Sequence, residues 1–266
     1  MQKVVDIKIN TYMPGGSDEP VSYNCAECRD TGWISTERGM VPCPCRDVEI
    51  KLRRQLACGL TPVLAQKIFE SFDITFYEEY LKTEKGKTFR GQAQKIFDAC
   101  RSYAENFKPG ESTRGILLRG DVGRGKTYLA AAICNALLER GIMSYFLIVP
   151  EFLDEIRASY GSSGEFSEMK LMNKAMQTPF LVLDDLGSHN FSAWTIDKLF
   201  TLINYRVNHG LPFVITTNLT ISELQSMLGE RIISRIAEAC DFYCLQSGND
   251  IRMLLNMKKA EAETEA

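Results

Sequence analysis

Histidine is scarce in this chain of 266 residues, since only His189 and His209 occur and both lie far from the cysteine-rich N-terminal part. A histidine-based metal site is therefore not expected there. No apolar run approaches the roughly 20 residues that a membrane helix needs. The first ten residues, MQKVVDIKIN, also lack the apolar core of a secretory signal. The sequence thus predicts a cytoplasmic protein with no membrane contact.

A strong charge of one sign is also missing. The net charge of −3 argues against a generally basic nucleic-acid coat protein, although a local basic groove would still be compatible with it. No internal repeat and no long low-complexity tract occur. With 45% hydrophobic and 24% charged residues, the composition is that of an ordinary globular protein.

The chain divides into three parts. Residues 1–46 form a turn-rich module with four close cysteines, residues 47–60 are expected to be a helical linker, and residues 61–266 form an α/β body. Short apolar runs alternate with helical patterns in this body. The expected strands are 115–119, 144–149, 180–184, 212–217 and 242–246. From residue 114 onward, the expected helices are 127–141, 150–160, 166–177, 193–208 and 249–260. This alternation predicts an α/β fold with a parallel sheet that helices cover on both faces.

One glycine-rich turn carries the most specific motif of the sequence. Residues 120–127, GDVGRGKT, match the phosphate-binding pattern GxxxxGK[ST] between an expected strand and an expected helix. Its glycines let backbone N–H groups surround phosphates, and Lys126 adds a point charge. The Thr127 hydroxyl is expected to bind Mg²⁺. The predicted ATP contacts are Gly120, Asp121, Val122, Gly123, Arg124, Gly125, Lys126, Thr127 and the adjoining Tyr128.

Two carboxylates lie at the end of the expected strand 180–184. Ligands of parallel sheets bind at the carboxyl ends of strands, so Asp184 and Asp185 should lie beside the phosphate loop. We expect Asp184 on the Mg²⁺ side and Asp185 to polarise the attacking water. The alternative is that one of them caps the next helix.

Four cysteines close to one another predict a metal site. Cys25 and Cys28 form a CxxC pair, Cys43 and Cys45 form a CxC pair, and fourteen residues separate the two pairs. Four thiolates suit tetrahedral Zn²⁺, and so small a module gains stability from a metal. CxC is less usual than CxxC, Cys58 is an alternative ligand, and free or redox-active cysteines are the competing interpretation.

The motifs in order resemble the AAA+ ATPases, and within them the replicative helicase loaders of the DnaC/DnaI type. The resemblance covers residues 60–258 and rests on GDVGRGKT, AAAICNALLERG, LVLDDLG, VITTN, LGERIISRI and GNDIR. It implies a parallel AAA+ sheet with a reduced C-terminal lid. The family usually has Asp-Glu where this chain has Asp184-Asp185, so a slow intrinsic hydrolysis rate is expected.

The resemblance also assigns four further residues. It implies that Asn218 is the sensor-1 residue, that Arg235 is an arginine finger with Arg231 as the reserve, and that Arg252 is the sensor-2 arginine. Taken singly, each has a plainer interpretation: a turn-forming Asn, a solvated basic helix face, and a surface charge.

The function that the resemblance implies is an ATP-dependent loader of the replicative hexameric DNA helicase onto single-stranded DNA. The zinc module would contact the helicase, and the body would self-associate into an ATP-dependent spiral or ring. Residues 160–166 are a candidate DNA-facing loop, although an ordinary surface loop fits equally well. Two alternatives remain, a transposition helper ATPase of the IstB type and an adaptor that binds ATP without hydrolysing it.

Overall fold

The computed structural model describes residues 25–36, 39–159, 165–188 and 191–264. The chain forms two compact units, and the division falls between Arg54 and Gln55, inside helix α1 (Cys45–Ala57). The candidate DNA-facing loop lies mostly outside the described residues. Each unit is considered by itself below.

The first unit contains a short antiparallel hairpin. Strand β1 (Trp33–Thr36) pairs with β2 (Gly39–Pro42) in a register that sets Trp33 opposite Pro42. A tight turn precedes the hairpin, with Arg29 and Asp30 at φ 51° and 63° and Gly32 at φ 74°. These left-handed conformations fold the CxxC segment back toward the hairpin, which brings the two cysteine pairs together.

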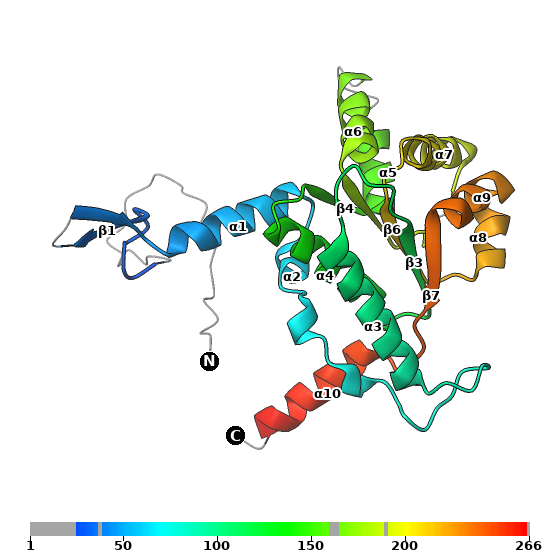
Figure 1. Cartoon of the computed structure of the whole chain (residues 1–266), viewed down its shortest axis with the longest axis horizontal. Helices are drawn as coiled ribbons and strands as arrows, with labels where there is room; N and C mark the ends of the chain where they lie inside the picture. The colour runs from blue at the N-terminus through cyan, green and yellow to red at the C-terminus, as the bar shows by residue number, and fades with distance from the viewer. Residues whose placement is uncertain (1–24, 37–38, 160–164, 189–190, 265–266) are drawn as a thin grey trace. The chain divides into compact units, whose positions relative to one another are not determined.

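The second unit is built on a five-stranded sheet whose neighbouring strands all run parallel, in the order β4-β5-β6-β3-β7 (Figure 1). The strands are β3 (Gly115–Arg119), β4 (Ser144–Ile148), β5 (Phe180–Asp184), β6 (Phe213–Thr217) and β7 (Cys240–Cys244). Strands β3, β5 and β6 are adjacent in the sheet order β5-β6-β3. Their carboxyl ends therefore meet at one edge, where motifs distant in sequence can act together.

Helices connect the strands and cover the sheet. They are α2 (Pro62–Ala65), the 3-10 helices η1 (Phe69–Ser71) and η2 (Ile74–Phe76), α3 (Phe89–Asn106), α4 (Lys126–Glu139), α5 (Val149–Ala158), α6 (Glu165–Gln177), α7 (Ala193–Asn208), α8 (Ile221–Leu228), α9 (Glu230–Ala239) and α10 (Ile251–Thr264). Hydroxyl side chains begin several of them. Thr88 and Ser192 accept N–H groups of the first turns of α3 and α7, and Thr220 forms a capping box with Glu223 at α8.

Alternate strand residues enter two separate cores. Leu117, Leu181 and Ile215 face the core that α5 to α9 complete, whereas Leu118, Val182 and Val214 face the core shared with α3 and α4. All six are fully buried or nearly so, which explains why the strands are apolar on both faces. Helices on both faces of a parallel sheet agree with the expectation from the sequence (Figure 1).

A buried arginine connects elements of the core that α5 to α9 complete. Arg206 of α7 is 0% exposed, and its guanidinium donates to the main-chain carbonyls of Ala175, Met176, Thr178 and Pro212. Burial lowers the pKa of Arg206 to about 9. The side chain thus ties the end of α6 to the residue before β6.

The expected elements agree with the observed ones apart from their ends. The last strand was expected at 242–246 but begins at Cys240, because Asp241 occupies an exposed position beside Arg114 rather than interrupting the strand. After β7 the described chain has one helix, α10, in keeping with a reduced lid. Across the described residues, no helix combines the length and the apolar character that crossing a bilayer requires.

Candidate nucleotide site and cysteine cluster

The turn between β3 and α4 has the backbone of a phosphate-binding loop. Gly120, Gly123 and Gly125 have φ values of 145°, 74° and 82°, a region that favours glycine. Gly125 directly precedes α4, whose first N–H groups have no partners inside the helix. The loop therefore presents amide groups and the positive end of a helix dipole toward one side, which is the arrangement that binds polyphosphate.

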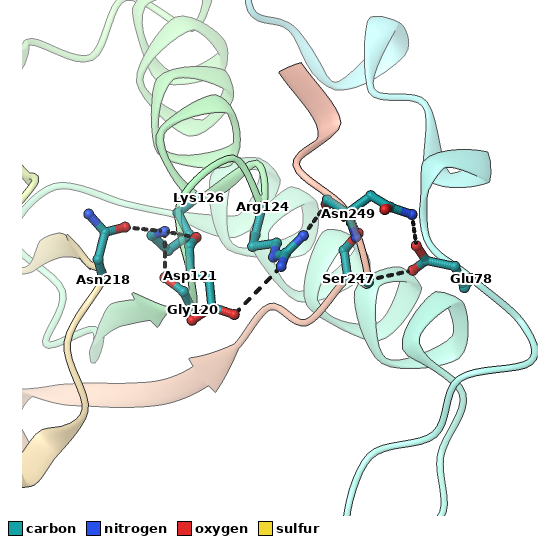
Figure 2. Close-up of polar contacts among 9 residues, drawn as sticks. Glu78, Gly120, Asp121, Arg124, Lys126, Asn218, Ser247 and Asn249 are labelled. Carbon is teal, nitrogen blue, oxygen red and sulfur yellow. Dashed lines mark hydrogen bonds and ion pairs between the residues drawn. The ribbon is translucent and has the colours of Figure 1, made fainter. Parts of the chain in front are cut away.

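Lys126 links this loop to the end of β6. Its side chain is 6% exposed, and Nζ lies 2.6 Å from the carbonyl oxygens of Gly120 and Asp121 and 2.6 Å from Oδ1 of Asn218 (Figure 2). Burial, as the largest influence, lowers the pKa of Lys126 to about 8, opposed by the charge of Asp185. The ammonium group of Lys126 is thus held between the phosphate loop and the residue that follows β6.

The two aspartates meet the loop from β5. Asp184 is 5% exposed, and its Oδ2 accepts a hydrogen bond of 3.3 Å from the Thr127 hydroxyl. Its Oδ1 accepts one of 2.6 Å from Thr216. Burial raises the pKa of Asp184, although the two hydroxyl groups act in the opposite direction. A carboxylate and a hydroxyl lying together in this way supply the hard oxygen ligands that Mg²⁺ prefers.

Asp185 takes a different position from its neighbour. Its φ of 59° turns the chain away from the strand direction, its N–H donates to Thr216 Oγ1 at 2.9 Å, and its Oδ1 accepts from Nδ2 of Asn218 at 3.2 Å. Since a lysine ammonium can only donate, Asn218 must direct its oxygen to Lys126 and its nitrogen to Asp185. Asp185 is half-buried whereas Asp184 is buried, so Asp185 is the more accessible of the two carboxylates for water.

The other loop residues lie around this centre in different ways. Val122 is 54% exposed, whereas the Arg124 side chain lies 3.6 Å from the Asp121 carboxylate and also donates to Asn249 O (Figure 2). The Tyr128 hydroxyl donates to the carbonyl of Ile68 at 3.0 Å. Arg124 and Tyr128 thus support the loop through their side chains.

The three arginines assigned by resemblance have separate surroundings. Arg231 lies over the Phe200 ring, 4.7 Å from its centroid, and Arg235 pairs with Glu238 at 2.9 Å. Both belong to α9, and these partners lie on α7 and α9 rather than in the loop. Arg252 is exposed at the start of α10, close enough for its charge to lower the pKa of Lys126.

Two side chains of this site had not been predicted. Thr216 contacts both aspartates, and the fully buried Tyr77 donates from its hydroxyl to the carbonyl of Arg124 at 2.7 Å. A signal for Thr216 existed, because a threonine pair ends the otherwise apolar β6. Tyr77 gave none, since it lies 47 residues before its partner.

The sulfur atoms of the four N-terminal cysteines form a compact cluster. The sulfur atoms of Cys25, Cys28, Cys43 and Cys45 all lie within 4.8 Å of one another, with 3.7 Å from Cys25 to Cys43 and 3.4 Å from Cys28 to Cys45. Tetrahedral zinc with Zn–S bonds of about 2.3 Å separates its sulfurs by about 3.8 Å. The cluster thus fits a Cys₄ metal site.

Cys58, considered above as an alternative ligand, belongs to the second unit. It is buried, and its carbonyl accepts the N–H of Phe146 on β4. The remaining cysteines are also buried or half-buried, as expected of small hydrophobic side chains: Cys100, Cys134, Cys240 and Cys244.

Comparison with known proteins identifies the family. The model of IstB-like ATP binding proteins matches residues 91–242, more than half of the chain. The replicative helicase loader DnaI of Bacillus subtilis (strain 168) is 35% identical over 133 residues, which make up 50% of this chain and 40% of DnaI. The replicative helicase loader DnaC of Escherichia coli (strain K12) is 30% identical over 137 residues, or 52% of this chain and 55% of DnaC. The matches thus span about half the length of these curated relatives.

A solved structure supports the same relationship. The crystal structure of the DnaC helicase loader superposes with a TM-score of 0.56 and 26% identity, covering 70% of this chain and 100% of that one. The expected α/β fold of the AAA+ type is therefore confirmed. The chain belongs to the family of IstB-like ATP-binding proteins and is homologous to the replicative helicase loaders DnaI and DnaC.

Proposed function

We propose that this protein is a cytoplasmic, ATP-dependent loader that places a replicative hexameric helicase on single-stranded DNA. The observation that supports the ATPase part is the meeting of Lys126, Thr127, Asp184 and Asn218 at the carboxyl ends of three adjacent strands. The loader part rests on the homology to DnaI and DnaC, which are replicative helicase loaders.

Each residue of the site has a role in this proposal. Lys126 and the loop amides bind the β- and γ-phosphates, while Thr127 and Asp184 hold Mg²⁺. Asp185, oriented by Asn218, polarises the attacking water.

The arginines act on charge that develops during phosphoryl transfer. Arg235, or Arg231 in its place, reaches the γ-phosphate of a neighbouring subunit, so that hydrolysis depends on assembly. Arg252 approaches the phosphates from α10 in the same subunit. The shorter Asp185, in place of the usual Glu, is expected to make the intrinsic rate slow.

The cysteine cluster provides the second part of the proposal. With zinc bound, residues 25–45 would form a rigid module that contacts the helicase. This module favours a loader over an IstB-type transposition helper, with which the chain shares the ATPase body.

The experiment is copurification of the full chain with the replicative helicase of its host, with and without ATP. We expect ATP-dependent recovery of the helicase, and we expect Lys126→Ala to abolish ATP binding. Lys108→Ala is the matched control, because it removes a lysine that is 66% exposed and paired with Glu111. Recovery of a transposase without helicase would support the transposition helper, and absence of hydrolysis with helicase and single-stranded DNA present would support the adaptor. Unchanged ATP affinity in Lys126→Ala would remove the ATPase proposal.

A further inference from the structure

The chain between β7 and α10, residues 245–251, lies along the phosphate loop, and we call it the strap. It begins where the Leu245 N–H donates to the carbonyl of Arg119 at 2.8 Å. The Leu245 carbonyl then occupies the space beside Gly120, where a Cβ would approach it to 2.2 Å. Only glycine at position 120 allows the strap to lie this close.

The strap touches the loop again at its far end. The Ile251 N–H donates to the Gly123 carbonyl at 3.1 Å, and the Asp250 carboxylate packs on Gly123, where a Cβ would lie 1.9 Å from Oδ1. Arg124 donates to the Asn249 carbonyl between these points (Figure 2). The strap thus contacts the loop through main-chain hydrogen bonds at its two ends and through the Arg124 and Asp250 side chains near its far end.

Glu78 holds the strap from the opposite side. Its two carboxylate oxygens accept the Gly248 N–H at 2.9 Å and the Asn249 side-chain amide at 3.1 Å (Figure 2). A side chain at position 248 would force Glu78 or Leu81 to shift, because a Cβ would lie 2.9 Å from Oε1 of Glu78 and 2.8 Å from Leu81. Although desolvation acts against it, these hydrogen bonds keep the pKa of Glu78 below its ordinary value.

The residue before Glu78 contacts the loop itself. Tyr77 donates to the Arg124 carbonyl, so two consecutive residues hold the loop and the strap respectively. The position of α10 follows from this contact, because Asp250 accepts the Arg252 N–H at 2.8 Å and begins the helix. Arg252 therefore follows three residues after Asn249, the last residue that Glu78 binds.

We propose that Glu78 is a positioning residue of the nucleotide site, which fixes the strap and thereby holds the Arg252 guanidinium beside the phosphate loop. The inference rests on the proposed ATP binding. Glu78 is placed to act on ATP indirectly, through the strap and the Arg252 guanidinium that follows it.

The test measures ATP affinity of the full chain with a fluorescent ATP analogue in Mg²⁺. Glu78→Ala removes both acceptors, and we expect affinity to fall about tenfold, the size of a lost charge-assisted hydrogen bond. Glu78→Gln keeps one acceptor and should lose less. Glu79→Ala is the matched control, because Glu79 is adjacent but binds Arg90 instead of the strap.

A double-mutant cycle with Arg252→Ala tests whether Glu78 acts on ATP affinity through Arg252. In the Arg252→Ala background, Glu78→Ala should cause no further loss. The proposal is overturned if Glu78→Ala lowers affinity equally in both backgrounds, if it has no effect, or if Glu79→Ala does the same. If the Glu78→Ala protein does not fold, the same double-mutant cycle is measured with Glu78→Gln. Failure of the wild-type protein to bind ATP would instead count against the proposed function, and is seen before any Glu78 variant is compared.

Discussion

The ammonium nitrogen of Lys126 lies 2.6 Å from Oδ1 of Asn218, although 92 residues separate them. The same Asn218 donates to Asp185 at 3.2 Å. A single amide therefore stands between the cation of the phosphate loop and the carboxylate proposed to polarise water. This arrangement makes the protonation of Lys126 and the position of Asp185 interdependent.

Affinity for ATP should fall as pH rises above about 8. The pKa of Lys126 is lowered from 10.5 to about 8, chiefly by burial, and only the protonated form attracts phosphate. Between these values the folded chain binds fewer protons than the unfolded chain, so stability of the free protein gains from rising pH while ATP binding loses. The expected loss approaches about tenfold per pH unit, measured by titration from pH 7 to 10.

A variant tests the cause of this pH dependence. Asn218→Asp places a carboxylate at Lys126, which should raise its pKa and move the loss of affinity to higher pH. A flat profile for the wild-type protein, or identical profiles for the two proteins, would contradict the assignment.

Asp184→Asn should remove the Mg²⁺-dependent part of ATP binding. The carboxylate meets the Thr127 hydroxyl at 3.3 Å, and an amide at this position cannot supply the negative charge that Mg²⁺ requires. We expect hydrolysis to fall on the order of a hundredfold, with affinity measured in EDTA little changed. Asp197→Asn, on the exposed side of α7, is the control. Full Mg²⁺ dependence in Asp184→Asn would place the metal elsewhere.

Arg235→Ala should lower kcat on the order of a thousandfold and leave ATP affinity unchanged, because an arginine supplied to a neighbour acts on the transition state. Activity should return when the variant is mixed with Lys126→Ala protein, whose intact Arg235 can serve the neighbour's site. Arg101→Ala removes an exposed, ion-paired arginine of α3 and should leave kcat unchanged. If Arg235→Ala stays active, the same mixing experiment with Arg231→Ala tests the reserve residue.

Purified protein should contain about one zinc per chain, as a closed Cys₄ site predicts. Elemental analysis of Cys43→Ser should give well under one, since this sulfur lies 3.7 Å from that of Cys25. Cys244→Ser, in the second unit, should keep its zinc. Equal zinc content in the two variants, or none in the wild-type protein, would show that the cluster is not a zinc site.

The elements of this fold were predictable where a local pattern sufficed. The parallel strands are apolar on both faces, so Leu117 and Leu118 both predict burial although they enter different cores. Strand β7 was placed less well, because Asp241 breaks the apolar pattern and its partner Arg114 lies 127 residues earlier. Central strands, which are apolar on both faces, are therefore easier to locate in the sequence than an edge strand such as β7, whose apolar pattern a polar residue interrupts.

The centre of the candidate site was predictable for a different reason. Lys126 and Asp184 were expected to lie close together because each lies at or after the end of a parallel strand, and the carboxyl ends of these strands share one edge of the sheet. No knowledge of their contacts was needed for this expectation. Tyr77 and Glu78 did not follow from this rule, because they lie outside the strands and each has a main-chain partner, the Arg124 carbonyl and the Gly248 N–H respectively. A main-chain partner leaves no trace in the sequence that would link the two residues.

The buried Arg206 depends on partners of the same kind. Its four acceptors, at residues 175, 176, 178 and 212, are all peptide carbonyls. Every amino acid supplies such a carbonyl, so those four positions can drift during evolution without depriving the guanidinium of its acceptors. Arg206 itself cannot be replaced by lysine without losing donors, since a lysine side chain has one nitrogen and two nitrogens of the guanidinium donate hydrogen bonds here. Among relatives that keep this junction, we expect an invariant arginine surrounded by positions that vary.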